Sequence, residues 1–291
     1  MTNAKIDALK FIKGVPHDLE IVNTGSTFAK YGFDYNYFDK KGFNFAIAPQ
    51  PLSYDYKILN QYKGNLKKGA IVVVVAVCPF EFSVAEYKND DSNYKYYFFL
   101  NEQQINNYSK RKTFFVKYCS IALEPKLIFG AIKMLIKKLI KYESRKTDDV
   151  AGTIKQTAKE RIDGWKGQFN LTNLTKYASD ERLEETFRET TNNLRKILEL
   201  CIENEFCPVI INMPACKEES DEFSEEIIEK FYNENIKKAN VYKIPVIDYF
   251  RDKRFHDHSL YMNADCLNDK GREFFAKIFT EDLKKMGLWE V

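Results

Sequence analysis

The order of apolar and polar positions along the chain predicts short buried strands. Residues 70–80 read AIVVVVAVCPF, a run of β-branched and other apolar side chains that follows Gly69. A run of this length and composition is typical of a strand with two buried faces, as in a parallel sheet covered by helices. Further apolar strands are predicted at residues 19–25, 42–49, 207–214 and 241–250.

Amphipathic helices are predicted between these strands. In the segment 181–206, Leu183, Phe187, Leu194 and Leu198 recur at helical spacing. Further helices are predicted at residues 53–69, 221–239 and 268–286. Strands and helices that alternate at these intervals imply right-handed crossovers. We therefore predict an α/β fold, a three-layer α/β/α sandwich whose sheet is mainly parallel.

The middle of the chain lacks this alternation. We predict a single domain, 1–291, with an inserted, mainly helical segment at about 81–179. Residues 94–117 combine aromatic side chains with Arg111 and several lysines. Such a stretch could stack on sugars or bases, but we favour a packed core of the insertion.

A second part of the insertion, residues 124–146, reads as a basic amphipathic helix. Its broad apolar stripe consists of Leu127, Phe129, Ile132, Leu135, Ile136, Leu139 and Ile140, and Lys133, Lys137, Lys138 and Lys141 lie elsewhere on the helix. One interpretation is a helix packed on its own domain with its lysines in water. The other is contact with a membrane surface or a protein through residues 126–141.

Composition excludes several classes of protein. The 291 residues include 45 basic and 42 acidic side chains, so the net charge of +3 does not favour nucleic-acid binding. The GxGxxG, GxxxxGK[ST] and HExxH motifs are missing, and we predict neither cofactor nor metal. The six cysteines lack CxxC spacing, which favours reduced thiols. Residues 1–16 do not resemble a secretory signal, so we expect a cytoplasmic protein, membrane-associated if residues 126–141 bind lipid.

Candidate chemistry lies in the turns after the predicted strands, because ligands of open α/β sheets bind at the carboxyl ends of the strands. The first turn reads NTGSTFAKYGFD from Asn23, and the second reads AIAPQPLSYDY from Ala46. A third segment near the C-terminus reads NADCLNDKG from Asn263.

Together these motifs resemble the SGNH (GDSL-type) hydrolase superfamily, in its branch associated with bacterial surface polysaccharides. That branch opens with a Gly-Ser-Ser turn and a Gly-Phe-Asp step, and it closes with Asp-x-x-His-Leu-Asn-x-x-Gly. The resemblance covers most of the chain except the insertion. It implies acyl-ester hydrolysis or acyl transfer, in which a serine attacks a carbonyl, a histidine takes its proton and an aspartate orients the histidine.

The chain departs from this pattern at each catalytic position. The family's nucleophile falls on Thr27, or on Ser26 if the alignment shifts by one residue. Cys266 replaces the histidine and Asn263 replaces the aspartate. A thiol is a poor general base for a hydroxyl, and a neutral amide cannot offset an imidazolium charge. The standard triad is therefore absent.

Other residues are candidates for a rewired site. His256 and His258 precede Cys266 by eight to ten residues, and one of them could fold back to serve as a base. Cys266 could then act as a thiolate nucleophile if its pKa were lowered. The spacing of the two histidines also suggests a metal site, but a third ligand is missing and an exposed loop is favoured. Candidate substrate-binding residues at the predicted edge are Gly25, Gln50, Asn212, Asp265 and Asn268.

Two functions follow from these patterns. One is an SGNH-like protein of surface-polysaccharide biosynthesis, with esterase or acyltransferase activity that is low or uses the rewired site. The other is a non-catalytic protein that binds a glycan, an acylated small molecule or a protein partner.

Overall fold

The computed structural model describes residues 3–76, 79–84, 90–118, 150–169, 171, 174–178 and 180–290. The chain forms two compact units. The smaller comprises Met1–Val15 with Tyr87–Asp148, and the larger comprises Pro16–Glu86 with Asp149–Val291. The insertion predicted at 81–179 is divided between them, and the predicted helix at 126–141 lies outside the described residues.

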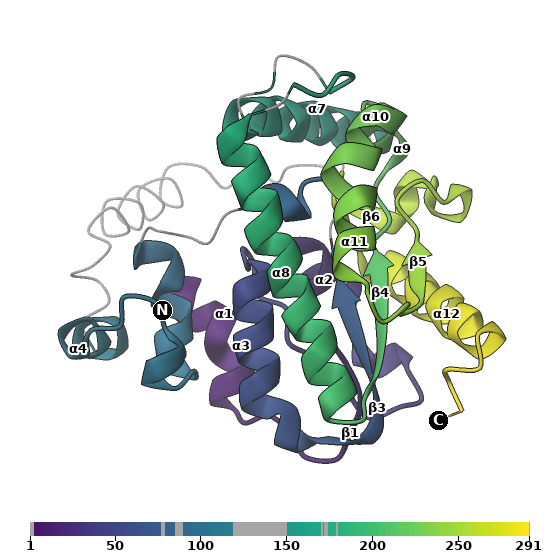
Figure 1. Ribbon diagram of the computed structural model, residues 1–291. Coiled ribbons are helices and arrows are strands. Elements are labelled where there is room, and N and C mark those ends of the chain that lie inside the picture. Colours follow the sequence, from purple (N-terminus) through teal and green to yellow (C-terminus); the bar gives the residue numbers. More distant parts are fainter. Residues whose placement is uncertain are drawn as a thin grey trace, which may run out of the picture. The chain divides into compact units, whose positions relative to one another are not determined.

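The larger unit is built on five parallel strands in the order β2-β1-β3-β4-β5 (Figure 1). Their bounds are β1 Leu19–Asn23, β2 Gly42–Asn44, β3 Leu66–Val75, β4 Cys207–Asn212 and β5 Val246–Asp248. The apolar residues 71–75 of the central strand β3 are at most 1% exposed. Since neighbouring helices bury both faces of this strand, the sequence-based prediction of a parallel α/β sheet is confirmed.

Helices cover the sheet as the α/β/α sandwich requires. On one face, α3 (Leu52–Tyr62) and α8 (Glu181–Glu203) lie side by side, and α11 (Glu234–Ala239) contacts α8 (Figure 1). On the other, α2 (Thr27–Gly32) contacts α12 (Asp269–Lys285). Aromatic stacking helps to join α2 to α12, because the Phe33 ring that follows α2 lies 5.2 Å from that of Phe275.

Several predicted boundaries differ from the structure. Strand β3 begins at Leu66, which pairs with Leu19, so the helix expected over 53–69 ends at Tyr62. The single helix expected over 221–239 is interrupted by a π-helical turn at Glu229–Asn233. It separates α10 (Glu225–Ile228) from α11.

The last part of the mainly helical segment predicted at 81–179 contains a 20-residue helix, α7 (Val150–Phe169), which was not predicted individually from the sequence. This helix packs on α9 (Lys217–Ser220) and on β6 (Tyr261–Asn263). Strand β6 pairs in the antiparallel sense with β7 (Cys266–Leu267) to form a small hairpin. The helix was missed because its buried positions, Ile154, Ala158 and Ile162, form a narrow stripe in an otherwise polar segment.

The smaller unit contains α1 (Asn3–Ile12), a 3₁₀ segment (Asp90–Phe98) and α4 (Lys110–Tyr118). Tyr94, Tyr96 and Tyr97 are at most 8% exposed, and the Phe11 and Phe99 rings stack at 4.0 Å. The interpretation of residues 94–117 as a packed core therefore holds for their first part. None of the helices within the described residues has both the length and the apolar character needed to cross a membrane.

Candidate functional site

The turn after β1 is a tight passage that only glycine fits. Gly25 has a φ of +117°. A Cβ on this residue would lie 2.8 Å from the Ala29 Cβ and 2.9 Å from the Val75 Cβ. Glycine has no Cβ and adopts positive φ without steric cost. The chain therefore passes closely over β3 and enters α2 directly, which places Ser26 and Thr27 at the start of that helix.

The two hydroxyls of the turn have different surroundings. The Ser26 Oγ accepts a hydrogen bond from the Gln50 N–H at 3.0 Å. The half-buried Thr27 hydroxyl has no hydrogen-bond partner among the described residues. Ser26 thus helps to join the first turn to the second, whereas the Thr27 hydroxyl is the one left to meet a ligand.

A carboxyl group that the sequence did not single out lies behind this turn. The Gly25 N–H donates to Asp55 Oδ1 at 2.9 Å, and the Gln50 side-chain amide donates to the same oxygen. Asp55 is fully buried on α3. Burial raises the pKa of Asp55 from 3.8 to about 7, although the hydrogen bonds from Gly25 and Gln50 favour the ionised form.

Four residues of the first turn, the second turn and the start of α3 carry buried polar atoms without a partner. They are Thr24 Oγ1, Gln50 Oε1, Ser53 Oγ and Asp55 Oδ2, for which the described residues supply no hydrogen bond. We call these four residues the turn cluster. Native structures rarely leave buried polar atoms unsatisfied, so such a group calls for water or for a polar ligand.

The side chain of Gln50, a candidate substrate-binding residue, is engaged by other residues of the turn. Its side-chain Nε2 donates to the Gly25 carbonyl oxygen at 3.2 Å as well as to Asp55. Gln50 is 3% exposed, so its side-chain amide stabilises the turn from the interior of the larger unit. The Gly25 N–H is likewise engaged by Asp55.

The hairpin β6–β7 brings the C-terminal motif to the first turn, because β7 packs against α2. Cys266 begins β7 and is 3% exposed, and burial raises the pKa of its thiol to about 12. The Asn263 Oδ1 accepts a hydrogen bond from the Asp265 N–H at 3.2 Å. Thr27 and Cys266 thus lie on neighbouring elements, as the resemblance implies, but the thiol is protonated near neutrality.

The two histidines of the rewired interpretation have other surroundings. The His258 Nε2 lies 2.9 Å from a Glu218 carboxylate oxygen. The His256 Nε2 is buried and has no hydrogen-bond partner within the described residues. Among those residues, neither imidazole forms a hydrogen bond with Ser26, Thr27 or Cys266.

A buried acidic group adjoins the hairpin. Asp265 is 4% exposed and forms an ion pair with Arg161 of α7. Glu219 is fully buried, and neither of its carboxylate oxygens has a partner in the described part of the chain. Burial, followed by repulsion from Asp265, raises the pKa of Glu219 well above its usual value. Among the described residues, no three His, Cys, Asp or Glu side chains are placed to hold a metal ion.

Asn268 and Asn212, both candidate substrate-binding residues, make contacts within the fold. The Asn268 Oδ1 accepts from the Gly271 N–H at 3.0 Å and so caps α12, while its Nδ2 donates to the Ser259 and Tyr261 carbonyl oxygens. The Asn212 Nδ2 donates to Asp248 Oδ1 at 2.9 Å, which links the carboxyl ends of β4 and β5.

Asn268→Ala is expected to lower the free energy of unfolding by about 1–2 kcal/mol, since it removes a helix cap and two loop contacts. Urea denaturation would measure the change. Asn268→Asp keeps the capping oxygen but loses the amide donor, so it should cost less. Equal losses in both variants would show that the cap itself contributes nothing.

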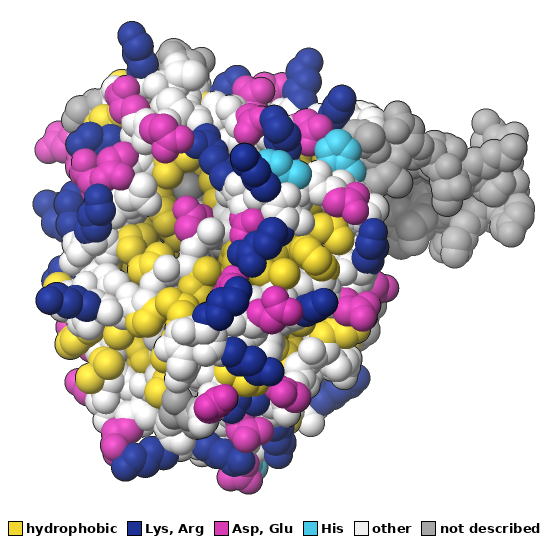
Figure 2. Space-filling view, turned by 90° about the vertical axis from the view of Figure 1, so that its right-hand side faces the viewer, with side chains coloured by type: hydrophobic (Ala, Val, Ile, Leu, Met, Phe, Trp, Pro, Cys, Tyr) yellow, Lys and Arg dark blue, Asp and Glu magenta, His cyan; other side chains and the backbone are white. Residues whose placement is uncertain are grey.

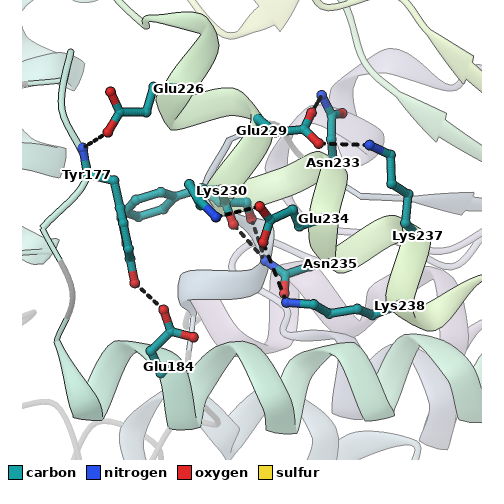
Figure 3. Close-up of polar contacts among 11 residues, drawn as sticks. Tyr177, Glu184, Glu226, Glu229, Lys230, Asn233, Glu234, Asn235, Lys237 and Lys238 are labelled. Atoms are coloured by element: carbon teal, nitrogen blue, oxygen red, sulfur yellow. Dashed lines mark hydrogen bonds and ion pairs between the residues drawn. The ribbon is translucent and has the colours of Figure 1, made fainter.

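Outside this edge of the sheet, a polar network covers α8. Lys230 pairs with Glu234 at 2.6 Å and Lys237 with Glu229 at 2.7 Å, while Tyr177 contacts Glu184 and Glu226 (Figure 3). Beside it lies a cavity of about 660 Å³ whose lining includes Arg188, Arg195 and Lys238 together with Glu184 and Glu189. The charges that line this cavity have both signs, so they do not select a ligand of one charge. We assign the polar network beside it to packing of the π-helical turn and α11 on α8.

The face that α12 and β5 occupy carries mixed charges. Lys and Arg side chains alternate there with Asp and Glu, and apolar side chains show between them (Figure 2). The described part of this face presents no continuous patch of one sign.

Comparison with known proteins does not assign this chain to a family. Neither a scan against protein-family models nor a search of curated proteins finds a match. Support for the parallel five-stranded sheet therefore comes from the structure itself.

Proposed function

We propose that this chain is an SGNH-hydrolase-like protein that binds an acylated glycan at the carboxyl edge of its sheet without hydrolysing it through the family's triad. The turn cluster carries the proposal. It contains unpartnered polar atoms of Gln50 and Asp55, whose other atoms bond Gly25 and Ser26 of the turn, and a sugar hydroxyl or an ester carbonyl could satisfy atoms of this kind.

The state of the replaced triad supports binding over hydrolysis. The Cys266 thiol is buried with a pKa of about 12, so it is neither a thiolate nucleophile nor a base at neutral pH. The His258 imidazole lies against Glu218 rather than against a hydroxyl of the turn. The role in surface-polysaccharide biosynthesis follows from the resemblance of the motifs and belongs to this proposal.

A second candidate is weak ester hydrolysis that uses Thr27 or Ser26. One observation favours it: the pKa of Asp55 is raised to about 7, which suits a general base. Asp55 accepts a hydrogen bond from the Gly25 N–H and forms none with a hydroxyl of the turn. It could act as a base only through a water between its carboxylate and the hydroxyl of Ser26 or Thr27.

Hydrolysis of p-nitrophenyl acetate by the purified protein separates the two functions. We expect the wild-type rate to equal the buffer rate, and Ser26→Ala, Thr27→Ala and Asp55→Asn to leave it unchanged. Activity that one of these variants abolishes would identify an enzyme and contradict the binding proposal. The double variant Asn263→Asp/Cys266→His restores the family's residues, so activity only in this protein would indicate a cleft that lacks a base.

Calorimetric titration with an O-acetylated chitooligosaccharide tests binding directly. We expect saturable binding that Thr27→Ala weakens, because this change removes a half-buried hydroxyl that makes no hydrogen bond within the described residues. The matched variant Thr153→Ala changes an exposed threonine of α7 and should bind as the wild type does. Identical titrations for wild type and Thr27→Ala would exclude this turn as the glycan site.

A further inference from the structure

Helix α4 of the smaller unit carries an exposed aromatic surface. Phe114, Phe115 and Tyr118 are 56%, 42% and 76% exposed. Their rings touch, with centroids 5.8 Å apart for Phe114 and Phe115 and 5.5 Å apart for Phe114 and Tyr118. Scattered apolar side chains are normal on a protein surface, but a contiguous aromatic patch marks a site of interaction.

The patch points away from the unit that supports it. Val116 is 2% exposed and therefore faces the interior of the smaller unit. Successive residues of a helix turn by about 100°, so Phe114 and Tyr118, each two positions from Val116, project from the opposite side. The exposure of these two rings thus follows from the orientation of the helix.

Side chains behind α4 hold it in this orientation. The Thr113 hydroxyl donates to the Tyr108 oxygen at 3.0 Å, and the Tyr108 hydroxyl donates to Glu102 at 2.7 Å. The Tyr97 ring stacks on Tyr108 at 5.4 Å. These contacts connect α4 to the preceding residues of the smaller unit and help to fix the orientation in which the aromatic rings are exposed.

All charged side chains of α4 are basic. Its nine residues KRKTFFVKY contain four basic and no acidic side chains, a formal charge of +4, whereas the whole chain carries only +3. Three of the four, Lys110, Arg111 and Lys112, stand in the first turn, where the helix dipole favours acidic residues. Because Lys110 and Arg111 are exposed, their charges are accessible to an external anion.

We propose that α4 docks on an anionic lipid bilayer, with Phe114, Phe115 and Tyr118 at the level of the headgroups and the basic side chains on lipid phosphates. Aromatic rings concentrate at this level of a membrane, and basic helices with an apolar surface bind anionic lipid. Single-stranded nucleic acid also attracts basic and aromatic residues, but it needs ring faces open to bases. Here the Phe114 and Phe115 rings pack edge to face at 84° and the Phe114 and Tyr118 rings are tilted by 44°, so the three rings do not form a parallel stacking surface, which favours lipid.

Flotation of the full chain with lipid vesicles tests this proposal. We expect binding to phosphatidylcholine vesicles that contain phosphatidylglycerol, and none to phosphatidylcholine alone. Phe114→Ser/Phe115→Ser should weaken binding at least about tenfold because it removes two buried rings. Lys110→Gln/Arg111→Gln should weaken it about 30-fold, at about 1 kcal/mol for each charge.

Two matched variants control for general effects of surface polarity and charge. Val241→Ser/Tyr242→Ser changes an exposed apolar pair of the larger unit, and Lys155→Gln/Lys159→Gln removes two exposed lysines of α7. Both should bind vesicles as the wild type does. All four double variants replace exposed or half-exposed side chains, so thermal unfolding should coincide with that of the wild type.

Three results would overturn the proposal. Unchanged vesicle binding by Phe114→Ser/Phe115→Ser would assign lipid contact to another part of the chain, residues 119–149 included. Binding to single-stranded RNA but not to vesicles would make the partner a nucleic acid. Loss of self-association in the aromatic variant, without any vesicle binding, would make the partner a second copy of the chain. None of these results bears on glycan binding by the larger unit.

Discussion

Gly25→Ala is expected to lower the free energy of unfolding by about 2–6 kcal/mol. A positive φ of +117° strains any residue with a Cβ, at about 1–3 kcal/mol. The added methyl group would also press on Ala29 and Val75 in the core, which costs about 1–3 kcal/mol more. Urea denaturation followed by circular dichroism would measure the sum.

Two other glycines of the larger unit separate these causes. Gly287 has a φ of +69° and no atom within 4 Å of an added Cβ, so Gly287→Ala measures the backbone cost alone. Gly64 has neither feature, and Gly64→Ala should change stability by about 0.5 kcal/mol or less. If Gly25→Ala lowered the free energy of unfolding no more than Gly287→Ala does, the space around Gly25 next to β3 would be larger than in the structure.

The sheet could be predicted from the sequence because the buried runs of β3, residues 70–75, and of β4, residues 208–211, are apolar throughout. The β-branched run of β3 is buried, and so is the apolar segment of β4. Runs of this composition are typical of strands with two buried faces. The edge strand β5 is only three residues long and half exposed, so its pattern predicted a strand but not its bounds. Boundaries depend on pairing, as the contact between Leu66 and Leu19 illustrates.

Part of the candidate site could also be predicted. Ser26 and Thr27 follow a predicted strand, and they lie at the carboxyl end of β1 as parallel topology requires. The packing of β7 on α2 brings Cys266 toward them, which order along the chain alone does not reveal.

Asp55 was missed although the sequence carries a signal for it. It stands three residues after Leu52 and four before Leu59, on the apolar face of a predicted helix. A carboxylate at such a position is rarely buried without a partner, so it deserves notice in a sequence. The contact between Arg161 and Asp265 has no comparable signal, because 104 positions separate the two residues.

The turn after β1 joins the stability of the fold to the chemistry of the candidate site. The Gly25 N–H, the Gln50 amide and the Asp55 carboxyl form one buried group of contacts, and Ser26 accepts from the Gln50 backbone. A change in the charge of Asp55 therefore acts on the residues that present the Thr27 hydroxyl. It follows that ligand binding at this turn should depend on pH near neutrality.

Asp55→Asn is expected to stabilise the protein at pH 8 by on the order of 4 kcal/mol and to have little effect near pH 4. The pKa of Asp55 is about 7 in the folded state and 3.8 as the reference for the unfolded state. Between these values the unfolded chain has lost the proton that the folded chain retains, so wild-type stability falls as pH rises. Asparagine keeps an oxygen for the Gly25 N–H and does not ionise.

Urea denaturation of both proteins at several pH values between about 4 and 8 measures this difference. Asp282→Asn is a control of opposite sign, because the pKa of Asp282 is lowered in the folded state, where Lys285 and Arg254 offset the cost of its partial burial. That variant should be less stable than the wild type at neutral pH and equal to it in acid. Parallel pH profiles for Asp55→Asn and the wild type would mean that Asp55 ionises at its ordinary pKa and that its burial does not oppose the charged form.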